Sequence, residues 1–394
     1  MTIKNAIVSV TNDLTTDQRV NRTCQALGKE GYHVLLIGRR LMNSRALEPR
    51  SYRMHRMRLI FNKGFLFYAE FNVRLFFYLL FHRYDLIVSN DLDTLPANHF
   101  ANLIKPYITR NPKPKIQNPK STIPHLHDCH EYFRGVPELV GRKTTIRIWK
   151  WFEDRIFPKL KHVIAVNQSV AGLYTREYGN NIEVIRNVPF RKTLNGARDR
   201  STLKIRSDLK IILYQGAVNI DRGLEEAILA MKHLETEAVL LIAGIGDISE
   251  TLQKLTIGNR LDEKVKFIGQ VPFQELHSYT LMADLGLSIE KNVSINYFFS
   301  LPNKFLDYIQ ANVPVLVSPF PEMKAIVDHY NIGEFIENHD PAVLAQKIDA
   351  MLKNPEKLAL YKKNLILAAE ELCWENEEVM YLEVVQRIKE KVTK

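Results

Sequence analysis

One short segment in the second half of the chain combines a helix start, a lysine and a carboxylate at helical spacing. Residues 300–310 read SLPNKFLDYIQ, and Ser300 is expected to cap a helix with Pro302 in its first turn. The unpaired N–H groups and the dipole at a helix N-terminus attract phosphate, and Lys304 adds positive charge there. Asp307 follows at helical spacing, where a carboxylate accepts hydrogen bonds from a ribose diol. The segment therefore suits a nucleotide diphosphate.

A glycine and an arginine follow an apolar strand earlier in the same half. Gly216 comes just after the strand predicted over residues 211–214, and Arg222 precedes the next helix. A glycine at a strand end lets backbone approach a phosphate closely, and a guanidinium offers the same group a forked pair of donors. Both positions fall at carboxyl ends of predicted parallel strands, where ligands bind in open α/β sheets. Gly244 and Gly246 are interpreted as a tight structural turn, because no third glycine completes a dinucleotide motif.

The first half carries histidines and carboxylates at the end of another predicted strand. The strand near residues 123–126 runs into the sequence HLHDCHE, which ends at Glu131. Three histidines and two carboxylates are compatible with a metal site, but no HExxH or similar spacing is present, so no metal is expected. His130 lies just beyond the strand, where an imidazole can hydrogen-bond a sugar hydroxyl.

Two further polar loops follow predicted strands in the first half. Thr16 or Asp17 is expected to cap a helix after the first strand. Asp91 or Asp93 is expected to cap the helix after the strand near residues 85–88, with an acceptor contact as the alternative role. Both helix starts point to the sheet edge that carries the histidines.

The whole chain alternates short apolar runs with longer amphipathic runs, which predicts an α/β protein with mostly parallel sheets. Its 394 residues are enough for two domains. The first is expected over residues 1–190, a linker over 191–203, the second domain over 204–374, and a helix that crosses back to the first domain over 375–394.

Two local expectations follow from prolines and from an asparagine. Asn312 is expected to end the helix of residues 302–310 in the left-handed conformation, before Pro314 leads into a strand. Residues 105–120, KPYITRNPKPKIQNPK, hold four prolines and five basic residues and cannot be regular throughout. That stretch is either a basic loop for an acceptor or a membrane, or a solvated connection.

Positive charge is concentrated in the first half of the chain. The net charge is +10, and residues 1–190 hold 29 Lys and Arg against 15 Asp and Glu. This excess predicts an anionic partner, whether nucleic acid, a phosphorylated lipid or the cytoplasmic face of a membrane. Nucleic acid is disfavoured because no zinc-finger spacing, aromatic RNA-binding signature or basic-leucine repeat is present. Three separated cysteines and the lack of a secretory signal predict a reducing, cytoplasmic setting.

The most apolar stretch is residues 65–82, FLFYAEFNVRLFFYLLFH. Glu70 and Arg74 inside it argue against a membrane-spanning helix. Two interpretations stay open. The stretch is either a core helix with two aromatic faces, or a helix with a cationic flank that lies in a membrane interface.

Taken together and in this order, these motifs resemble a family 4 glycosyltransferase of the two-domain GT-B fold. The matching pieces span nearly the whole chain and are residues 12–20, 90–93, 128–131, 216–223 and 301–308. The resemblance implies two Rossmann-like domains with parallel sheets that face a central cleft. It also implies a retaining transferase, a nucleotide diphosphate sugar bound mainly by the second domain, an acceptor bound by the first, and no required metal or other cofactor.

The resemblance also assigns roles to individual residues. The catalytic residues are His130, near the donor sugar, with Arg222 and Lys304 at the diphosphate. Donor contacts are Gly216 at the diphosphate, Gly269 and Gln270 at the base, Asp307 at the ribose, and also Asn303 and Glu290. Acceptor or cleft positions are Asp13, Thr16, Asp17, Arg19, Asp91, Asp128 and Glu131.

The chain departs from the family pattern in two places. Many members carry two glutamates eight positions apart, and the corresponding residues here are Phe299 and Asp307. Glu290 is the candidate to replace the missing carboxylate near the donor sugar. The first-domain loop also has Asp13, Thr15 and Thr16 in place of the usual paired glycines.

The sequence therefore predicts a cytoplasmic glycosyltransferase, peripheral at the inner face of the cell membrane. It would move a sugar from a nucleotide diphosphate sugar to a glycan or lipid-linked acceptor, in the synthesis of cell-surface polysaccharide or lipopolysaccharide. Two alternatives stay open, a nucleotide-sugar epimerase of the same architecture and a degenerate, non-catalytic partner subunit that binds nucleotide or glycan.

Overall fold

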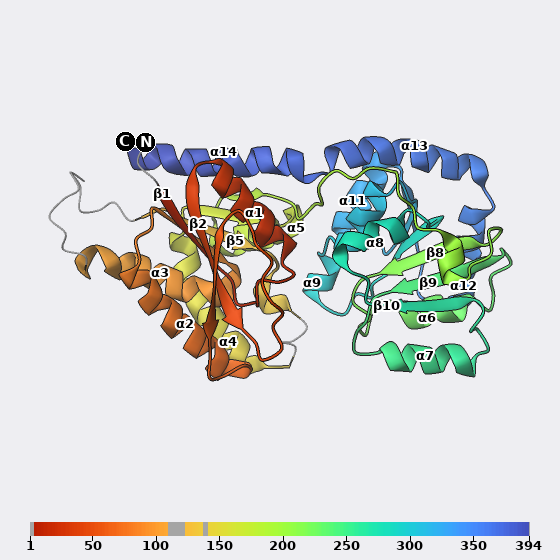
Figure 1. Ribbon diagram of the computed structural model, residues 1–394, viewed down its shortest axis with the longest axis horizontal. Coiled ribbons are helices and arrows are strands. Elements are labelled where there is room, and N and C mark those ends of the chain that lie inside the picture. Colours follow the sequence, from red (N-terminus) through yellow and green to blue (C-terminus); the bar gives the residue numbers. More distant parts are fainter. Residues whose placement is uncertain (1–3, 109–122, 137–140, 394) are drawn as a thin grey trace. The chain divides into compact units, whose positions relative to one another are not determined.

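The computed structural model describes residues 4–108, 123–136 and 141–393 (Figure 1). Its contacts divide the chain into two compact units, residues 1–187 with 377–394, and residues 188–376. Each unit is built on one parallel sheet with helices packed against it. The predicted α/β class with two parallel sheets is therefore confirmed.

Unit 1 contains a seven-stranded sheet in the order β3-β2-β1-β4-β5-β6-β7, in which every adjacent pair is parallel. The strand order reverses between β1 and β4, and ligands bind outside the carboxyl ends of strands at such a switch point. Its strands are β1 (Lys4–Ser9), β2 (Tyr32–Arg40), β3 (Arg53–Arg58), β4 (Leu86–Asn90), β5 (His125–Cys129), β6 (His162–Ala165) and β7 (Ile182–Val184).

The helices of unit 1 are α1 (Gln18–Lys29), α2 (Gly64–Phe81), α3 (Asp91–Ile108), α4 (Lys143–Ile156), α5 (Gln168–Tyr178) and the main part of α14 (Trp374–Thr393). Helices α2 and α3 pack on a face of the sheet through a cluster that includes Ile7 and Ile87. Helix α14 contacts α1, where Lys29 forms a salt bridge with Glu378 at 2.7 Å. Short 3-10 turns lie at Phe133–Gly135 and Phe157–Lys159.

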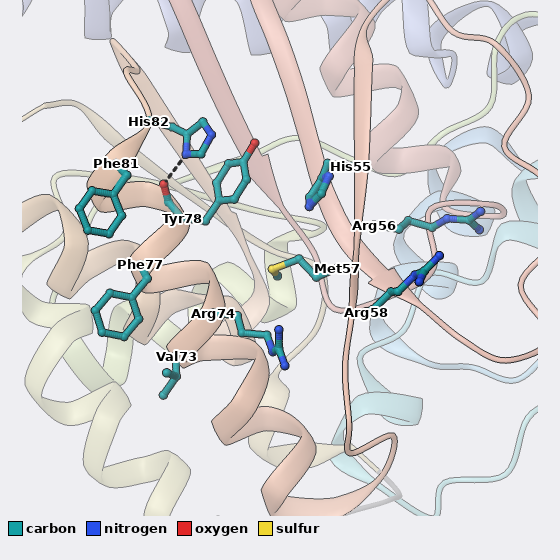
Figure 2. A pocket seen from close by; sticks show the side chains of 10 residues that line it. All are labelled: His55, Arg56, Met57, Arg58, Val73, Arg74, Phe77, Tyr78, Phe81 and His82. Carbon is teal, nitrogen blue, oxygen red and sulfur yellow. Dashed lines mark hydrogen bonds between the residues drawn. The ribbon is translucent and has the colours of Figure 1, made fainter.

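Strand β3 is an edge strand of unit 1, and helix α2 lies beside it. A pocket of about 610 Å³ opens between the two elements, lined by His55 to Arg58 on β3 and by residues of α2 such as Phe77 and Tyr78 (Figure 2). Helix α2 buries five side chains in the core, Phe67, Phe71, Leu75, Leu79 and Leu80. Its opposite side is exposed, so the prediction of a core helix holds for one face only.

Unit 2 contains a six-stranded parallel sheet in the order β10-β9-β8-β11-β12-β13, with its switch point between β8 and β11. Its strands are β8 (Lys210–Gln215), β9 (Ala238–Ala243), β10 (Val265–Gly269), β11 (Leu285–Ser288), β12 (Val315–Val317) and β13 (Gly333–Phe335). Its helices are α6 (Leu224–Ala230), α7 (Ser249–Gly258), α8 (Phe273–Thr280), α9 (Ile295–Phe298), α10 (Asn303–Gln310), α11 (Pro321–Tyr330), α12 (Pro341–Leu352) and α13 (Pro355–Glu371), with a 3-10 turn at Arg200–Leu203.

Both faces of the unit 2 sheet are buried. Successive side chains along a strand point to opposite faces, so Ile211 and Leu213 of β8 enter one core with α10 and α13. Ile212 and Tyr214 enter the other core with α6 and α12. This arrangement explains why the strands of unit 2 read as continuous apolar runs.

Local predictions had mixed outcomes. Asp17 caps α1 by accepting the N–H of Val20, as expected, and Asn312 is left-handed with a φ of 58°. The prediction that Ser300 caps the next helix is wrong, because Pro302 keeps an extended ψ of 138° and α10 begins only after it. The Ser300 hydroxyl instead donates to the carbonyl of Tyr297.

Of the stretch 105–120, only the first four residues are described, and they form the end of α3. Both roles suggested for this loop fall on residues 109–120, which lie outside the described residues.

Candidate active site

Three charged side chains meet at the switch point of unit 2. Glu290 follows strand β11, and its carboxylate Oε1 lies 2.5 Å from Nζ of Lys304 on α10. The same oxygen lies 3.6 Å from a guanidinium nitrogen of Arg222, in the loop before α6. The predicted convergence of Arg222 and Lys304 is present in the structure, and the residue that joins them is Glu290.

Helix α10 packs on the sheet through its buried apolar side chains, and one buried hydroxyl fixes its position on β8. Tyr308 Oη accepts the N–H of Gln215 at 3.2 Å and lies 3.0 Å from the carbonyl oxygen of Leu213, both on β8. Lys304, one turn earlier on α10, then lies with its Nζ 4.2 Å from the centre of the Tyr214 ring. A cation over an aromatic face is stabilised by the ring quadrupole. Sheet, ring and carboxylate together hold this lysine in one place.

Arg222 is placed by the glycine that follows it. Gly223 has a φ of 75°, and a Cβ atom there would lie 2.4 Å from the carbonyl oxygen of Ile289. The loop therefore needs glycine to bring Arg222 against strand β11. The guanidinium packs over the ring of Tyr297, with 4.4 Å between its central carbon and the ring centre. About a fifth of the Arg222 side chain stays exposed (22%), so this cation reaches solvent.

Glu290 has no exposed surface, and its second oxygen accepts a hydrogen bond from Ser288. Burial alone would raise the pKa of this carboxyl, but Lys304 and Arg222 hold it below its ordinary value, so Glu290 is ionised. A carboxylate without exposed surface does not fit the expected contact with a donor sugar. We therefore correct that expectation, because in this structure Glu290 positions the two cations.

Asp307 lies farther along α10 and already has polar partners. Its carboxylate accepts from Lys192 Nζ at 2.8 Å and from Gln215 Nε2 at 3.2 Å. Gln215 is oriented in turn by Thr280, whose hydroxyl donates to it at 2.7 Å. Each carboxylate oxygen has two lone pairs, so Asp307 keeps acceptor capacity for the ribose hydroxyls expected there.

The glycines of unit 2 fall into two groups. Gly216 and Gly269 have positive φ angles of 125° and 69°, and a Cβ at either position would meet nothing within 4 Å. These two expected donor positions are therefore open backbone. Gly244 is different, because its Cβ would lie 1.8 Å from the carbonyl oxygen of Gly216. Gly244 therefore lets two loops approach closely, in agreement with the tight turn predicted from the sequence. Gln270 and Asn303, the other expected donor residues, are exposed.

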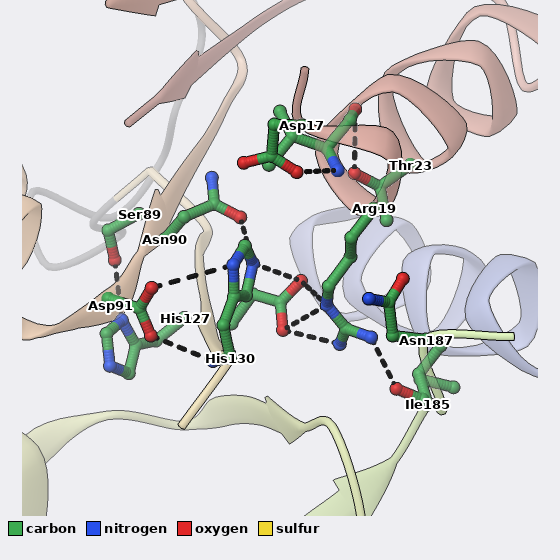
Figure 3. Close-up of polar contacts among 12 residues, drawn as sticks. Asp17, Arg19, Thr23, Ser89, Asn90, Asp91, His127, His130, Ile185 and Asn187 are labelled. Atoms are coloured by element: carbon green, nitrogen blue, oxygen red, sulfur yellow. Dashed lines mark hydrogen bonds and ion pairs between the residues drawn. The ribbon is translucent and has the colours of Figure 1, made fainter. Parts of the chain in front are cut away.

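The polar centre of unit 1 is His130, at the carboxyl end of β5 (Figure 3). Its backbone N–H donates to Asp91 at 2.8 Å, and its Nδ1 lies 3.5 Å from the other oxygen of that carboxylate. Its Nε2 lies 3.0 Å from Asn90 Oδ1 and 3.5 Å from Asp128 Oδ2. The imidazole is thus held from both nitrogens, with about a fifth of the side chain exposed (19%).

The charge of His130 follows from these neighbours. Burial would lower its pKa, but the carboxylates of Asp91 and Asp128 outweigh burial and raise the pKa to about 9. At neutral pH the ring is therefore a cation, and its two nitrogens face the acceptors Asp91, Asn90 and Asp128. Asp91, which begins α3, holds its carboxylate under the ring from a left-handed φ of 56°. A non-glycine residue in that region is uncommon and marks a site under constraint.

Asp128 is held by a buried ion pair with Arg19. The shortest contact is 2.6 Å, the two side chains are 1% and 3% exposed, and Arg19 also donates to the carbonyl of Ile185 at 2.6 Å. Burial would raise the pKa of Asp128, but Arg19 and His130 hold it well below its ordinary value. The expected acceptor contacts of Arg19 and Asp128 are wrong, because both side chains are buried. They orient His130 instead.

The remaining first-domain candidates lie in surface loops. Asp13 accepts from the hydroxyls of Thr15 and Ser44, at 2.6 Å and 3.2 Å. Asp17 caps α1, Thr16 is exposed, and Glu131 is half-buried beside His130 in sequence. Asp93 is not a cap, since its carboxylate accepts from Thr11 at 2.5 Å.

The other histidines of the HLHDCHE motif belong to the core. His125 and His127 both lie within 2.8 Å of the Ser89 hydroxyl, and burial lowers the pKa of His127 to about 4, which keeps it neutral. Within the part of the chain that the structure describes, no three His, Cys, Asp or Glu residues are grouped to hold a metal ion.

Four site residues were not singled out from the sequence. Gln215 and Asn90 end strands beside named candidates, and this position is a usable signal for polar side chains at a site. Lys192 and Tyr297 carry no such signal. Lys192 lies in a segment interpreted as linker, and Tyr297 is one of several aromatic residues in a row.

Sequence comparisons match each half of the chain to a glycosyltransferase model. Residues 17–188 match Glycosyltransferase Family 4, and residues 197–367 match Glycosyl transferases group 1. An uncharacterized glycosyltransferase of Methanocaldococcus jannaschii is 29% identical over 157 residues, which are 39% of this chain and 39% of that protein. The chain thus aligns with well under half the length of that relative.

Solved structures match over nearly the full length. Sucrose-phosphate synthase of Thermosynechococcus elongatus has a TM-score of 0.77 at 18% identity, covering 98% of this chain and all of the other. Anabaena HepE in complex with UDP has a TM-score of 0.68 at 14% identity, with 99% and 100% covered. WaaG, a glycosyltransferase involved in lipopolysaccharide biosynthesis, has a TM-score of 0.68 at 14% identity, with 95% and 99% covered. With a family match in each half and two parallel α/β units, the chain belongs to the family 4, group 1 glycosyltransferases of the GT-B fold.

Proposed function

We propose that this glycosyltransferase uses a nucleotide diphosphate sugar as donor and transfers the sugar with retention to a glycan or a lipid-linked acceptor. The single observation that carries the proposal is the convergence of Arg222 and Lys304 on the buried carboxylate of Glu290. Two cations around one carboxylate leave a net positive charge at the switch point of a parallel sheet, the place where such sheets bind ligands.

The chemistry of transfer explains why this charge would matter. As the bond between the anomeric carbon and the diphosphate oxygen breaks, negative charge builds up on the departing nucleotide diphosphate. Fixed cations aimed at that charge lower the barrier without reorganisation during the reaction. Arg222 and Lys304 are fixed in this way by Glu290, Tyr297 and Tyr214. We propose that this pair fills the electrostatic role that a metal ion has in other transferases.

Other parts of the donor are assigned by their chemistry. The open backbone at Gly216 would receive the diphosphate, Asp307 the ribose, and the backbone at Gly269 the base. Uridine diphosphate is the first nucleotide to test, since the structurally similar HepE was solved with UDP and with UDP-glucose. His130, a cation held at the carboxyl end of β5, would place its positive charge beside the transferred sugar.

The proposed acceptor and location rest on the positive charge of the first half of the chain and on the similarity to WaaG. The basic first half favours an anionic surface, and WaaG belongs to lipopolysaccharide biosynthesis. We therefore propose that the enzyme works at the inner face of a membrane, on a lipid-linked or polymeric glycan of the cell surface.

The test begins with binding. Thermal unfolding is measured with UDP, GDP, ADP, CDP and dTDP, since a nucleotide at a hundred times its Kd adds about 2.7 kcal/mol of stability. Arg222→Ala, which keeps the buried pair of Glu290 and Lys304, should unfold normally and lose the shift, whereas Lys254→Ala on the surface of α7 should keep it.

The same variants separate the candidate functions. Release of nucleotide diphosphate from a sugar nucleotide should fall about 100- to 1,000-fold in Arg222→Ala. Formation of an epimeric nucleotide sugar from donor alone would identify an epimerase. Binding without turnover would identify a non-catalytic subunit, and a fully active Arg222→Ala would refute the proposed diphosphate site. The anomeric configuration of the product, read by NMR, decides retention.

A further inference from the structure

Helix α2 presents a second apolar face that the described residues of the protein do not cover. Phe77 and Phe81 are 51% and 75% exposed and lie one helical turn apart, with Val73 one turn before them. Figure 2 shows these three side chains in a row along the helix. Other exposed apolar residues of the same two contacting helices and the segment before them are Ile60, Phe61, Phe65 and Leu66 near the start of α2, and Phe100, Leu103 and Ile104 on α3.

Positive charge lines the border of this face. Edge strand β3 carries Arg53 and Arg58, both exposed, and Arg83 follows α2. Arg56 and Arg74 line the pocket between the two elements, and His55 and His82 stack on either side of Tyr78 (Figure 2). Lys63 precedes the helix.

Two acidic groups of the described residues lie near this face, and only Glu70 has a cationic partner. Glu70 on α2 pairs with Arg74 at 2.7 Å and accepts the backbone N–H groups of Ile60 and Phe61. Asp85 accepts the N–H of Asn5 at 2.7 Å. The surface therefore combines bulky apolar side chains with a clear excess of cations.

We propose that the β3–α2 face, defined by strand β3, helix α2 and the residues that flank them, docks on a bilayer that contains anionic phospholipids. Phe77, Phe81 and their apolar neighbours would enter the headgroup and upper acyl region. Arg53, Arg56 and Arg58 would meet lipid phosphates, the 610 Å³ pocket taking one headgroup. The inference rests on the proposed function, because it names the surface on which a lipid-linked acceptor would be reached.

The structure favours lying in the interface over crossing the bilayer. By length and composition alone α2 could span a membrane. However, Phe67, Phe71 and Leu75 are buried against the sheet, and the salt bridge of Glu70 and Arg74 lies within the same helix. A helix that supplies part of a core cannot leave it without unfolding the unit.

A lipid surface also explains the residue types better than a nucleic acid does. Phosphate backbones attract arginine, but a row of exposed phenylalanine and aliphatic side chains needs an apolar phase to enter. Side chains such as Val73 and Leu66 offer no ring to stack on a base. Charge complementarity and exposed apolar area therefore point to the same partner.

The experiment measures sedimentation of the purified full chain with vesicles. Vesicles of phosphatidylcholine alone are compared with vesicles that contain phosphatidylglycerol, at low and high salt. The apolar variant is Phe77→Ser/Phe81→Ser and the charge variant is Arg53→Glu/Arg58→Glu. The matched controls change equally exposed residues of unit 2, Ile257→Ser/Leu367→Ser and Lys232→Glu/Lys254→Glu.

The wild-type chain should bind anionic vesicles at least about tenfold more strongly than neutral ones, and less so in high salt. The apolar variant should lose about tenfold in binding to anionic vesicles, and the charge variant should lose the preference for phosphatidylglycerol. The controls should behave as wild type. All variants should unfold at the wild-type temperature, because the changed side chains are exposed.

Equal binding of the wild-type chain to both vesicle types, or an equal loss of binding in the control variants, would overturn the proposal. It would also be overturned if the chain bound a uridine oligonucleotide but no vesicles, and if the charge variant abolished that binding. The UDP-dependent thermal shift is measured on the same samples. If the chain binds UDP but no vesicles, the docking proposal is refuted and the proposed nucleotide site stands. If it binds vesicles but no nucleotide, the nucleotide site is refuted and the docking proposal stands.

Discussion

Replacing Lys304 by methionine should destabilise unit 2 as well as weaken the binding of nucleotide. In the structure this lysine is the closest partner of Glu290, at 2.5 Å, and the carboxylate has no exposed surface. After Lys304→Met the nearest remaining cation is Arg222, whose nitrogen lies 3.6 Å away. The variant tests whether the cations are held in place by the buried carboxylate.

The expected cost follows from the burial of Glu290. Removing one partner of a buried ion pair costs about 3–5 kcal/mol, because the remaining charge is left uncompensated. By contrast, replacing both charges with neutral groups of similar size is often nearly neutral. Lys304→Met should therefore lose about 3–5 kcal/mol, and Lys304→Met/Glu290→Gln should recover most of that loss without recovering the binding of nucleotide.

The pH dependence gives a second test of the same pair. Lys304 and Arg222 hold the pKa of Glu290 below its ordinary value, so in the wild type this group contributes stability that is present above about pH 4.5 and is lost as pH falls. When Lys304 is replaced, burial raises the pKa of Glu290 instead, and this carboxylate takes up a proton when the variant folds. The deficit of Lys304→Met should therefore shrink as pH falls from 7 to 5.

The assay is hydrogen exchange read by mass spectrometry on peptides from β8, β11 and α10, because the chain has two units and a single unfolding curve would mix them. Lys324→Met is the matched control in the same unit. That lysine also covers a ring, of Phe335, and pairs with Asp328 at 2.7 Å, but both partners are half exposed. It should cost less than about 1 kcal/mol.

One result would refute this reasoning about Glu290. If Lys304→Met exchanges like the wild type and like Lys324→Met at every pH, the buried carboxylate does not depend on the lysine. Failure of Glu290→Gln to rescue the variant would show that Lys304 stabilises α10 in another way, such as its contact with Tyr214.

Three further predictions concern the rest of the site. The pKa of His130, raised from 6.5 to about 9, means that its imidazolium stabilises the fold fully below about pH 6.5 and loses this effect as pH rises through 9. In hydrogen exchange of peptides from β4 and β5, the stability difference between wild type and His130→Asn should shrink by about 2–3 kcal/mol across that range. Arg19→Met should lower the stability of unit 1 by about 3–5 kcal/mol, because it leaves the buried carboxylate of Asp128 without its cationic partner. Arg19→Met/Asp128→Asn should recover most of that stability. Gly223→Ala should cost about 2 kcal/mol or more in hydrogen exchange of peptides from α6 and β11, because its φ is positive and its Cβ would strike the carbonyl of Ile289. Unchanged exchange would contradict that contact.

Much of the architecture was predictable from local patterns. The alternation of short apolar runs with longer amphipathic runs predicts parallel sheets. Runs such as residues 211–214 are continuously apolar because both faces of their sheet are buried. Strand β3 was missed, since RMHRMR is mostly charged and lies at a sheet edge where burial imposes little pattern. Strand β13 was missed because its three residues, GEF, include only one apolar side chain.

The sequence alone singled out Arg222, Lys304, Asp307 and His130 as candidates, because polar residues near the carboxyl ends of parallel strands gather at one edge of a sheet. Their partners depended on the packing of distant segments. The local sequence does not show that Glu290 is buried beside two cations or that Arg19 forms a buried ion pair with Asp128. It also does not show which side of α2 the core covers. Helix α2 is apolar on both faces, so periodicity cannot choose between them, and only the position of the sheet decides which phenylalanines stay exposed.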